Sequence, residues 1–156
     1  MLYMPQRYDA RTFLICVDSY DDSVPVGQFY YPYREEVSAF CGLTQLLLKI
    51  DQCMDVENVP QSFNTVRTFF PLTGFWPDEC ADTTPRAGKA ATFALQLFFR
   101  RNASWQGSVT WLEKGKRENF RSVLELIFLM NSAITAKQMT LEQCYEEKYQ
   151  SLERAE

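Results

Sequence analysis

The apolar residues of this chain follow strand-like and then helix-like spacing, and they do so twice. Residues 12–31 and 92–112 hold runs of β-branched and aromatic residues broken by turn residues, as in strands joined by hairpins. The alternation is clearest over 105–112, where apolar and polar side chains take turns as they do in a half-buried strand. Residues 35–54 and 120–134 then carry apolar side chains at helical spacing. The pattern therefore predicts strand, turn, strand and helix in each part of the chain.

Four further segments refine these elements. Ser122 followed three residues later by Glu125 forms a capping box, which predicts the start of the second helix. The residues just before it, 116–120, also suit a short third strand, so each unit is predicted as ββα or βββα. Residues 64–70 have the composition of a strand, and residues 71–88 read as a loop because they contain three prolines and two glycines.

The two predicted units lie at a constant offset, without gaps, when Thr12 is aligned with Thr92. Sliding the chain against itself in this way aligns five identical residues and many conservative ones. The identical pairs are Thr12/Thr92, Phe13/Phe93, Gly27/Gly107, Phe40/Phe120 and Leu46/Leu126. The agreement predicts an internal repeat, and the alternative is a coincidence of two similar α+β patterns.

The predicted fold class is α+β. It comprises two tandem ββα or βββα repeats, with antiparallel sheet, one helix per repeat packed on it, and a C-terminal helix. The chain, residues 1–156, is predicted as a single domain with repeats at 12–54 and 92–134, a connector at 55–91 and a helical tail at 137–156. A chain of this length buries about 70% of its unfolded surface, so an apolar core suffices without disulfide or metal.

Composition argues against an enzyme. The chain has no histidine, which excludes the usual Ser-His-Asp and Cys-His nucleophiles and the common zinc helix. Its five cysteines form no C-x-x-C pair, and its six glycines form no phosphate-binding loop. We therefore predict no catalytic residues, no metal and no cofactor. Asp18, Asp21 and Asp22 are better explained as a solvated turn than as a cation site. No apolar stretch is long enough for a secretory signal or a membrane span, so the expected location is cytoplasmic, with no membrane partner.

The net charge of −4 hides an asymmetry. Residues 1–60 carry a net charge of −5, whereas residues 91–135 carry +3. Bases and aromatic rings gather between residues 100 and 121, as in an anion or nucleic-acid surface. The pI of about 5.0 favours the alternative, a solvated basic rim. The aromatic pair Phe75–Trp76 lies in the predicted loop and is expected either to pack onto the core or to contact a partner. The candidate binding residues are Arg100, Arg101, Trp105, Trp111, Lys114, Lys116, Arg117, Arg121, Phe75 and Trp76.

The second unit resembles a known group of proteins. Its W-x-G-x-V-x-W motif (Trp105 to Trp111), followed by F-R-S-x-x-E-L (Phe120 to Leu126), resembles uncharacterised small proteins from gut clostridial bacteria, often carried on mobile elements. The resemblance implies a bacterial accessory protein and transfers no binding or catalytic residue.

Three functions remain open on these observations. The leading hypothesis is a non-catalytic protein-interaction or regulatory module, because the chain has 12 Phe, 8 Tyr and 3 Trp and lacks catalytic residues. It predicts an exposed apolar patch around the loop or hairpin aromatics. The second is a nucleic-acid-associated regulator or host-defence inhibitor that uses residues 100–121. The third is a small-ligand domain with a pocket between the repeats. Oligomeric state is left open.

Overall fold

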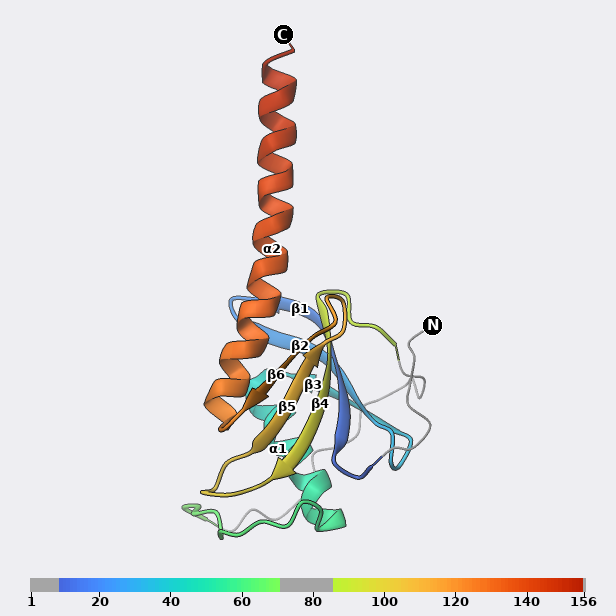
Figure 1. The fold of residues 1–156 in the computed structure, drawn as a ribbon, viewed down its shortest axis with the longest axis vertical. Coiled ribbons are helices and arrows are strands. Elements are labelled where there is room, and N and C mark those ends of the chain that lie inside the picture. The colour runs from blue at the N-terminus through green and yellow to red at the C-terminus, as the bar shows by residue number, and fades with distance from the viewer. Residues whose placement is uncertain (1–8, 71–85, 156) are drawn as a thin grey trace.

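A computed structural model of the protein has an α+β fold built on one six-stranded antiparallel sheet (Figure 1). The structure describes residues 9–70 and 86–155. The sheet order is β3-β2-β1-β4-β5-β6, so the two strands that begin the predicted repeats, β1 and β4, lie together at its centre. The strands are β1 (Thr12–Asp21), β2 (Val24–Tyr31), β3 (Glu36–Cys41), β4 (Ala91–Phe99), β5 (Gln106–Trp111) and β6 (Lys116–Phe120).

Helices α1 and α2 cover one face of this sheet. Helix α1 (Leu43–Glu57) packs on β2 and β3, and helix α2 (Val123–Glu153) packs on β4, β5 and β6. Leu46, Ile50 and Met54 from α1 and Leu126 and Ile134 from α2 belong to one buried cluster. The strands contribute every second residue to it, because successive side chains of a strand point to opposite faces. In the two central strands, β1 and β4, these are Phe13, Ile15, Val17, Ala91, Phe93, Leu95 and Leu97.

The opposite face of the sheet is partly covered by the chain that leads into β4. Cys16 is buried, and its thiol donates to the carbonyl of Arg86 at 2.7 Å. The guanidinium of Arg86 donates two hydrogen bonds of 2.6 Å to the carboxylate of Asp18. This segment closes over the central strands from the side away from the helices.

Most of the predicted elements are present, and the first helix is shorter at its start than predicted. The sequence pattern placed a helix from residue 35, but residues 36–41 form the edge strand β3 and the helix begins after Gly42. Gly42 has a φ of 92°, which a non-glycine residue rarely adopts, and it separates strand from helix. The pattern misled because Val37 and Phe40 fit either a helix face or a strand. Ser122 caps α2 as predicted, accepting a hydrogen bond from the backbone of Glu125.

Two other predictions for the connections and the tail need correction. Residues 64–70 form no strand; the segment is held to the sheet near Ser62, which makes an isolated bridge with Arg100. The predicted tail is helical, but it continues α2 without a break rather than forming a separate helix. Figure 1 shows this part of α2 extending well beyond the sheet, and Tyr149 and Leu152 are 69% and 65% exposed, so they do not pack on the body.

Candidate functional site

Two of the predicted binding residues are buried. Arg100 is 4% exposed, and its guanidinium donates to the carbonyl of Pro60 at 2.7 Å and to the carboxylates of Asp55 at 2.5 Å and Asp51 at 3.4 Å. Trp105 is also 4% exposed and donates its indole N–H to Asp51 at 3.0 Å. Both residues tie α1 to the second part of the chain. Neither side chain is therefore exposed on the surface that was predicted to bind a ligand. The sequence signal misled for Arg100 because charged residues are mostly exposed.

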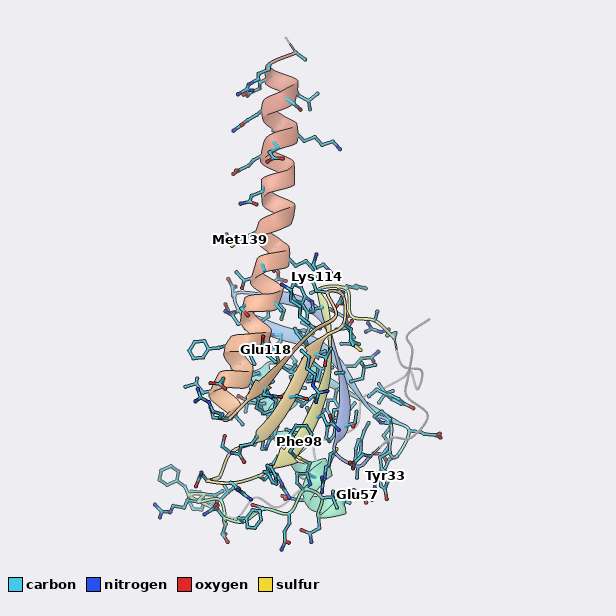
Figure 2. All side chains as sticks on the ribbon, viewed as in Figure 1. Tyr33, Glu57, Phe98, Lys114, Glu118 and Met139 are labelled. Atoms are coloured by element: carbon cyan, nitrogen blue, oxygen red, sulfur yellow. The ribbon has the colours of Figure 1, made fainter. Side chains whose placement is uncertain are left out.

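The remaining predicted bases do not form one cluster. Lys114 lies in the β5–β6 turn, at the opposite end of the sheet from Phe98 and the β4–β5 turn (Figure 2). Arg117 lies between these ends in β6 and is exposed. Arg121 is exposed, and its guanidinium is paired with Glu125 at 2.9 Å, one helical turn away. Trp111 is half-buried against the core, and Lys116 lies opposite it on β6. Phe75 and Trp76 lie outside the described residues.

Arg101 differs from the other predicted bases in the described ranges because it meets aromatic rings. Its guanidinium lies 4.6 Å from the ring centre of Phe99 and 5.5 Å from that of Phe63. The backbone around it is held in place, because Gln106 accepts from the N–H of Arg101 at 2.8 Å and donates to its carbonyl at 3.0 Å. The turn therefore presents a cation between two phenyl rings in a defined geometry.

The segment after α1 lies against this turn. The backbone N–H of Phe63 donates to the carbonyl of Arg100 at 3.4 Å, and Asn64 accepts from the N–H of Asn102 at 3.0 Å. Figure 1 shows residues 59–70 running beside the β4–β5 turn. These contacts bring two segments that are distant in sequence onto one surface.

Large apolar side chains on these two segments are exposed. Phe69 is 103% exposed, Phe70 82%, Phe63 66%, Val66 57% and Phe99 47%. We call these five residues, together with Arg101, the aromatic surface. The sequence pattern missed it because residues 64–70 were interpreted as a strand, which would have hidden alternate side chains. The signal that could have found it is the pair Phe69–Phe70 directly before a proline-rich stretch.

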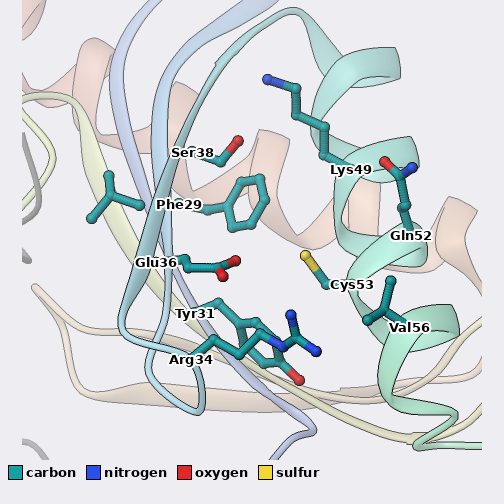
Figure 3. A pocket seen from close by; sticks show the side chains of 10 residues that line it. Phe29, Tyr31, Arg34, Glu36, Ser38, Lys49, Gln52, Cys53 and Val56 are labelled. Atoms are coloured by element: carbon teal, nitrogen blue, oxygen red, sulfur yellow. The ribbon is translucent and has the colours of Figure 1, made fainter. Parts of the chain in front are cut away.

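Two cavities in the described part of the chain lie between the sheet and the helices. The first cavity, about 220 Å³, lies between β2–β3 and α1 (Figure 3). The second, about 190 Å³, lies between β5–β6 and α2 and is lined by Trp111, Lys116, Glu118 and Leu129, among others. Each cavity uses strands and a helix that are consecutive in sequence, so neither matches the predicted pocket between the repeats.

The charged groups of the first cavity are arranged around buried rings. Phe29 and Tyr31 are 2% and 1% exposed, and the Tyr31 hydroxyl donates to the carbonyl of Ala10 at 2.8 Å. Burial raises the pKa of Tyr31 far above its ordinary value. At the rim, Arg34 is paired with Glu57. Tyr31 thus lines this cavity with its ring, while its hydroxyl stays protonated and bonded to Ala10.

Lys49 has an unusual position for a lysine. It is 9% exposed, and its ammonium donates to the carbonyl of Ala39 in the edge strand β3 at 2.6 Å. Gln45, one turn earlier in α1, accepts from the N–H of Cys41 at 2.9 Å. Helix α1 therefore satisfies backbone groups of the edge strand that β2 does not pair.

Cys16 and Asp18, both in β1, have shifted pKa values. Burial raises the pKa of the Cys16 thiol to about 11, so it stays protonated and poorly nucleophilic near neutral pH. The hydrogen bond from Arg86 lowers the pKa of Asp18, whose carboxylate is held in this salt bridge. Within residues 9–70 and 86–155, no group of three or more acidic or cysteine side chains could hold a metal ion.

No family model, curated protein or solved structure matches this chain. In the described part of the chain, no helix is long and apolar enough to cross a membrane. The function therefore has to be inferred from the surfaces and cavities themselves.

Proposed function

We propose that the protein is a non-catalytic protein-interaction module and that its contact surface is the aromatic surface. The observation that carries the proposal is the exposure of Phe69 and Phe70, at 103% and 82%. Two adjacent phenylalanines fully in water lose the hydrophobic stabilisation that burial would give, about 1.5–3 kcal/mol for each side chain. Exposed apolar residues that form a contiguous patch mark interaction sites, and Phe69 and Phe70 adjoin in the sequence.

The surface has a rigid part against which a partner can dock. Phe63 and Phe99 flank Arg101, and the backbone on both sides is held by hydrogen bonds to Gln106 and Asn64. A pre-organised aromatic anchor loses little conformational entropy on binding, which favours affinity. Aromatic residues and arginine are also the residue types that contribute most to binding at protein interfaces.

The charge of the surface indicates the chemistry of the partner. Residues 58–70 and 99–104 contain three bases and no acid; Arg100 is used internally, which leaves Arg67 and Arg101. A partner that buries the phenyl rings should therefore present an apolar face with carboxylates beside it. A nucleic acid is less favoured, because the protein has a pI of about 5.0 and its predicted basic cluster is dispersed.

The test is a selection of phage-displayed random peptides on the full-length protein. We expect enriched peptides that combine large apolar residues with Asp or Glu. A Phe69→Ser/Phe70→Ser variant should bind them at least about tenfold more weakly, which corresponds to about 1.4 kcal/mol. The matched control is Leu124→Ser/Phe128→Ser, which removes two side chains of 61% and 64% exposure from helix α2 and should leave binding unchanged.

Three outcomes would count against this function. If the peptides bind the Phe69→Ser/Phe70→Ser variant as tightly as the unaltered protein, their binding site is not the aromatic surface. Failure to enrich any peptide would remove the support. Binding of single-stranded DNA or RNA that falls steeply with salt, and that is lost in the same variant, would favour the nucleic-acid alternative.

We also propose that the fold arose from two copies of one βββα unit. Several features recur at the constant offset that aligns Thr12 with Thr92. The shift in strand register occurs at Val17/Ser19 and again at Leu97/Phe99. Positive φ angles recur at Asp22 and Asn102, and the glycines at 27 and 107 both lie against a carbonyl of the central strands. These correspondences support duplication. We further propose, from the resemblance of the second unit, that the protein is a cytoplasmic bacterial protein carried on a mobile element.

A further inference from the structure

The last turns of α2 stand clear of the sheet. Ile134 is 1% exposed and lies in the core, whereas residues 146–155 are all exposed. Figure 1 shows this red end of the helix extending away from the strands. Isolated helices shorter than about 12–15 residues are marginal in water, because most helical stability in proteins comes from packing. A partner that packs on these turns would therefore stabilise them. We call residues 146–153 the helix end.

The helix end carries an apolar pair with carboxylates beside it. Tyr149 and Leu152 are 69% and 65% exposed, and they share one face because residues three apart are neighbours on a helix. Glu146 lies three residues before Tyr149 and Glu153 lies four residues after it, so both border this face. Lys148 lies on the other side of the pair.

This face has the chemistry that the aromatic surface requires of a partner. The bases at the aromatic surface, Arg67 and Arg101, make no ion pair within the described ranges. Residues 137–156, by contrast, hold five acids and three bases. If the apolar pair covers the phenyl rings, Glu146 and Glu153 are available to approach these two arginines.

The two surfaces cannot meet within one molecule. Figure 1 shows the helix end and residues 59–70 at opposite ends of the long axis. Helix α2 runs for 31 residues without a break, a length of about 46 Å, so its end does not fold back. In an antiparallel pair of copies, however, each helix end lies beside the aromatic surface of the other copy. Such a twofold arrangement uses both contacts and closes at two copies.

We propose that the aromatic surface binds the helix end of a second copy of this chain, in a reciprocal dimer. The inference rests on the proposed function, because it names the partner of the same surface. Its two parts are the burial of Tyr149 and Leu152 on the phenyl rings and the pairing of Glu146 and Glu153 with the arginines.

The first test is sedimentation velocity of the full chain over a range of concentrations. We expect the mass to rise from the 18.2 kDa of one copy toward that of two. Tyr149→Ala/Leu152→Ala should weaken the association at least about tenfold, because it removes the apolar contact while alanine preserves the helix. The matched control Leu124→Ala/Phe128→Ala removes two side chains of 61% and 64% exposure from the start of the same helix and should leave the association unchanged.

An exchange of charges tests the pairing itself. At concentrations where the unaltered protein is dimeric, Glu146→Lys/Glu153→Lys should be monomeric, and so should Arg67→Glu/Arg101→Glu, because each variant brings like charges together. Mixed in equal amounts, the two variants should dimerise, since both contacts of the mixed pair then join opposite charges. All four residues are exposed, so the variants are expected to fold, which circular dichroism melts verify.

Four results would overturn the inference. These are a monomer at every concentration, association that survives Tyr149→Ala/Leu152→Ala, association that survives Phe69→Ser/Phe70→Ser, and a mixture of the charge variants that stays monomeric. The peptide selection separates this inference from the proposed function. A chain that stays monomeric while its aromatic surface still selects peptides refutes the dimer and leaves the proposed function supported.

Discussion

The first half of the chain (residues 12–58) and the second half (residues 92–134) use the same kinds of residue in the core and different kinds around the cavity. Positions such as Phe13 and Phe93, or Leu46 and Leu126, are buried in both. By contrast, Glu36 corresponds to Lys116, and Lys49 corresponds to Leu129. The comparison indicates that packing restricts the residue types of the core. The cavities between edge strand and helix tolerate a change in the charge of their lining side chains.

The halves are also joined to each other by matching contacts of unequal strength. Tyr20, at the end of β1, donates to Asn131 of α2 at 2.7 Å. At the corresponding position of the second half, Arg100 donates to Asp51 of α1 and to Asp55. Each half thus contacts the helix of the other at the same position, once through neutral groups and once through an ion pair.

The largest effect is expected from the two glycines. A Cβ at Gly27 would lie 1.9 Å from the carbonyl oxygen of Cys16, and one at Gly107 would lie 2.0 Å from that of Gln96. Because the obstacle is backbone in both cases, either Gly→Ala variant should lose about 4 kcal/mol or more in the free energy of unfolding. Urea denaturation measures it. If Gly27→Ala unfolds the protein and Gly107→Ala does not, the two halves are not equivalent at this position.

A smaller and unequal effect is expected at the contacts between the halves. Arg100→Ala removes a buried guanidinium from Pro60 and two carboxylates, and we expect a loss of about 3 kcal/mol. Tyr20→Phe removes one hydrogen bond and should cost about 1 kcal/mol. The same denaturation measurement compares the two, and equal losses would contradict the difference in strength drawn from the structure.

A third effect concerns acid sensitivity, for which the second half has no counterpart. Asp18 is paired with Arg86, whereas the corresponding residue of the second half is Phe98. The hydrogen bond from Arg86 lowers the pKa of Asp18 in the folded chain below its unfolded value. The resulting stabilisation is therefore present at neutral pH and lost as the pH falls through the folded-state pKa.

The variant Asp18→Asn tests this link. At neutral pH it should be less stable than the unaltered protein by about 1–2 kcal/mol, since the bond is charge-assisted. As the solution is acidified below the ordinary aspartate pKa of about 3.9, the two stabilities should converge. Parallel stability curves across this range would show that the pair contributes nothing to the acid response.

The elements that could be predicted from sequence were those with strong periodicity. The alternation around Val109 and the side-chain cap at Ser122 each required only neighbouring residues, and both are found in the structure. The Glu125 side chain, predicted to complete a capping box, accepts from the N–H of Arg121 instead. A third strand in each unit was one of the two predicted alternatives (βββα), but β3 could not be placed because it is short and its apolar residues, Val37 and Phe40, fit two periods. Only the geometry of Gly42 separates it from α1.

The candidate sites were harder to predict, because they depend on contacts between distant residues. Nothing near Arg100 in the sequence indicates that Asp51 and Asp55 pair with it. Likewise, the exposure of Phe69 follows from the path of the chain after α1 and not from its local composition. The sequence indicated that arginine and aromatic residues matter on the surface, and Arg101 is the predicted base in the described ranges that has rings beside it.

The side chains that reach the edge strand have a consequence for self-association. An open sheet presents backbone groups at both edges, to which a strand of another molecule can add, and unlimited addition gives fibres. Here Lys49 and Gln45 occupy the carbonyl of Ala39 and the N–H of Cys41, and Glu125 occupies the N–H of Arg121 at the other edge. Residues 116–118, Lys-Arg-Glu, add charge there. The helices that build the core thus also disfavour the addition of a strand from another molecule, one helix at each edge of the sheet.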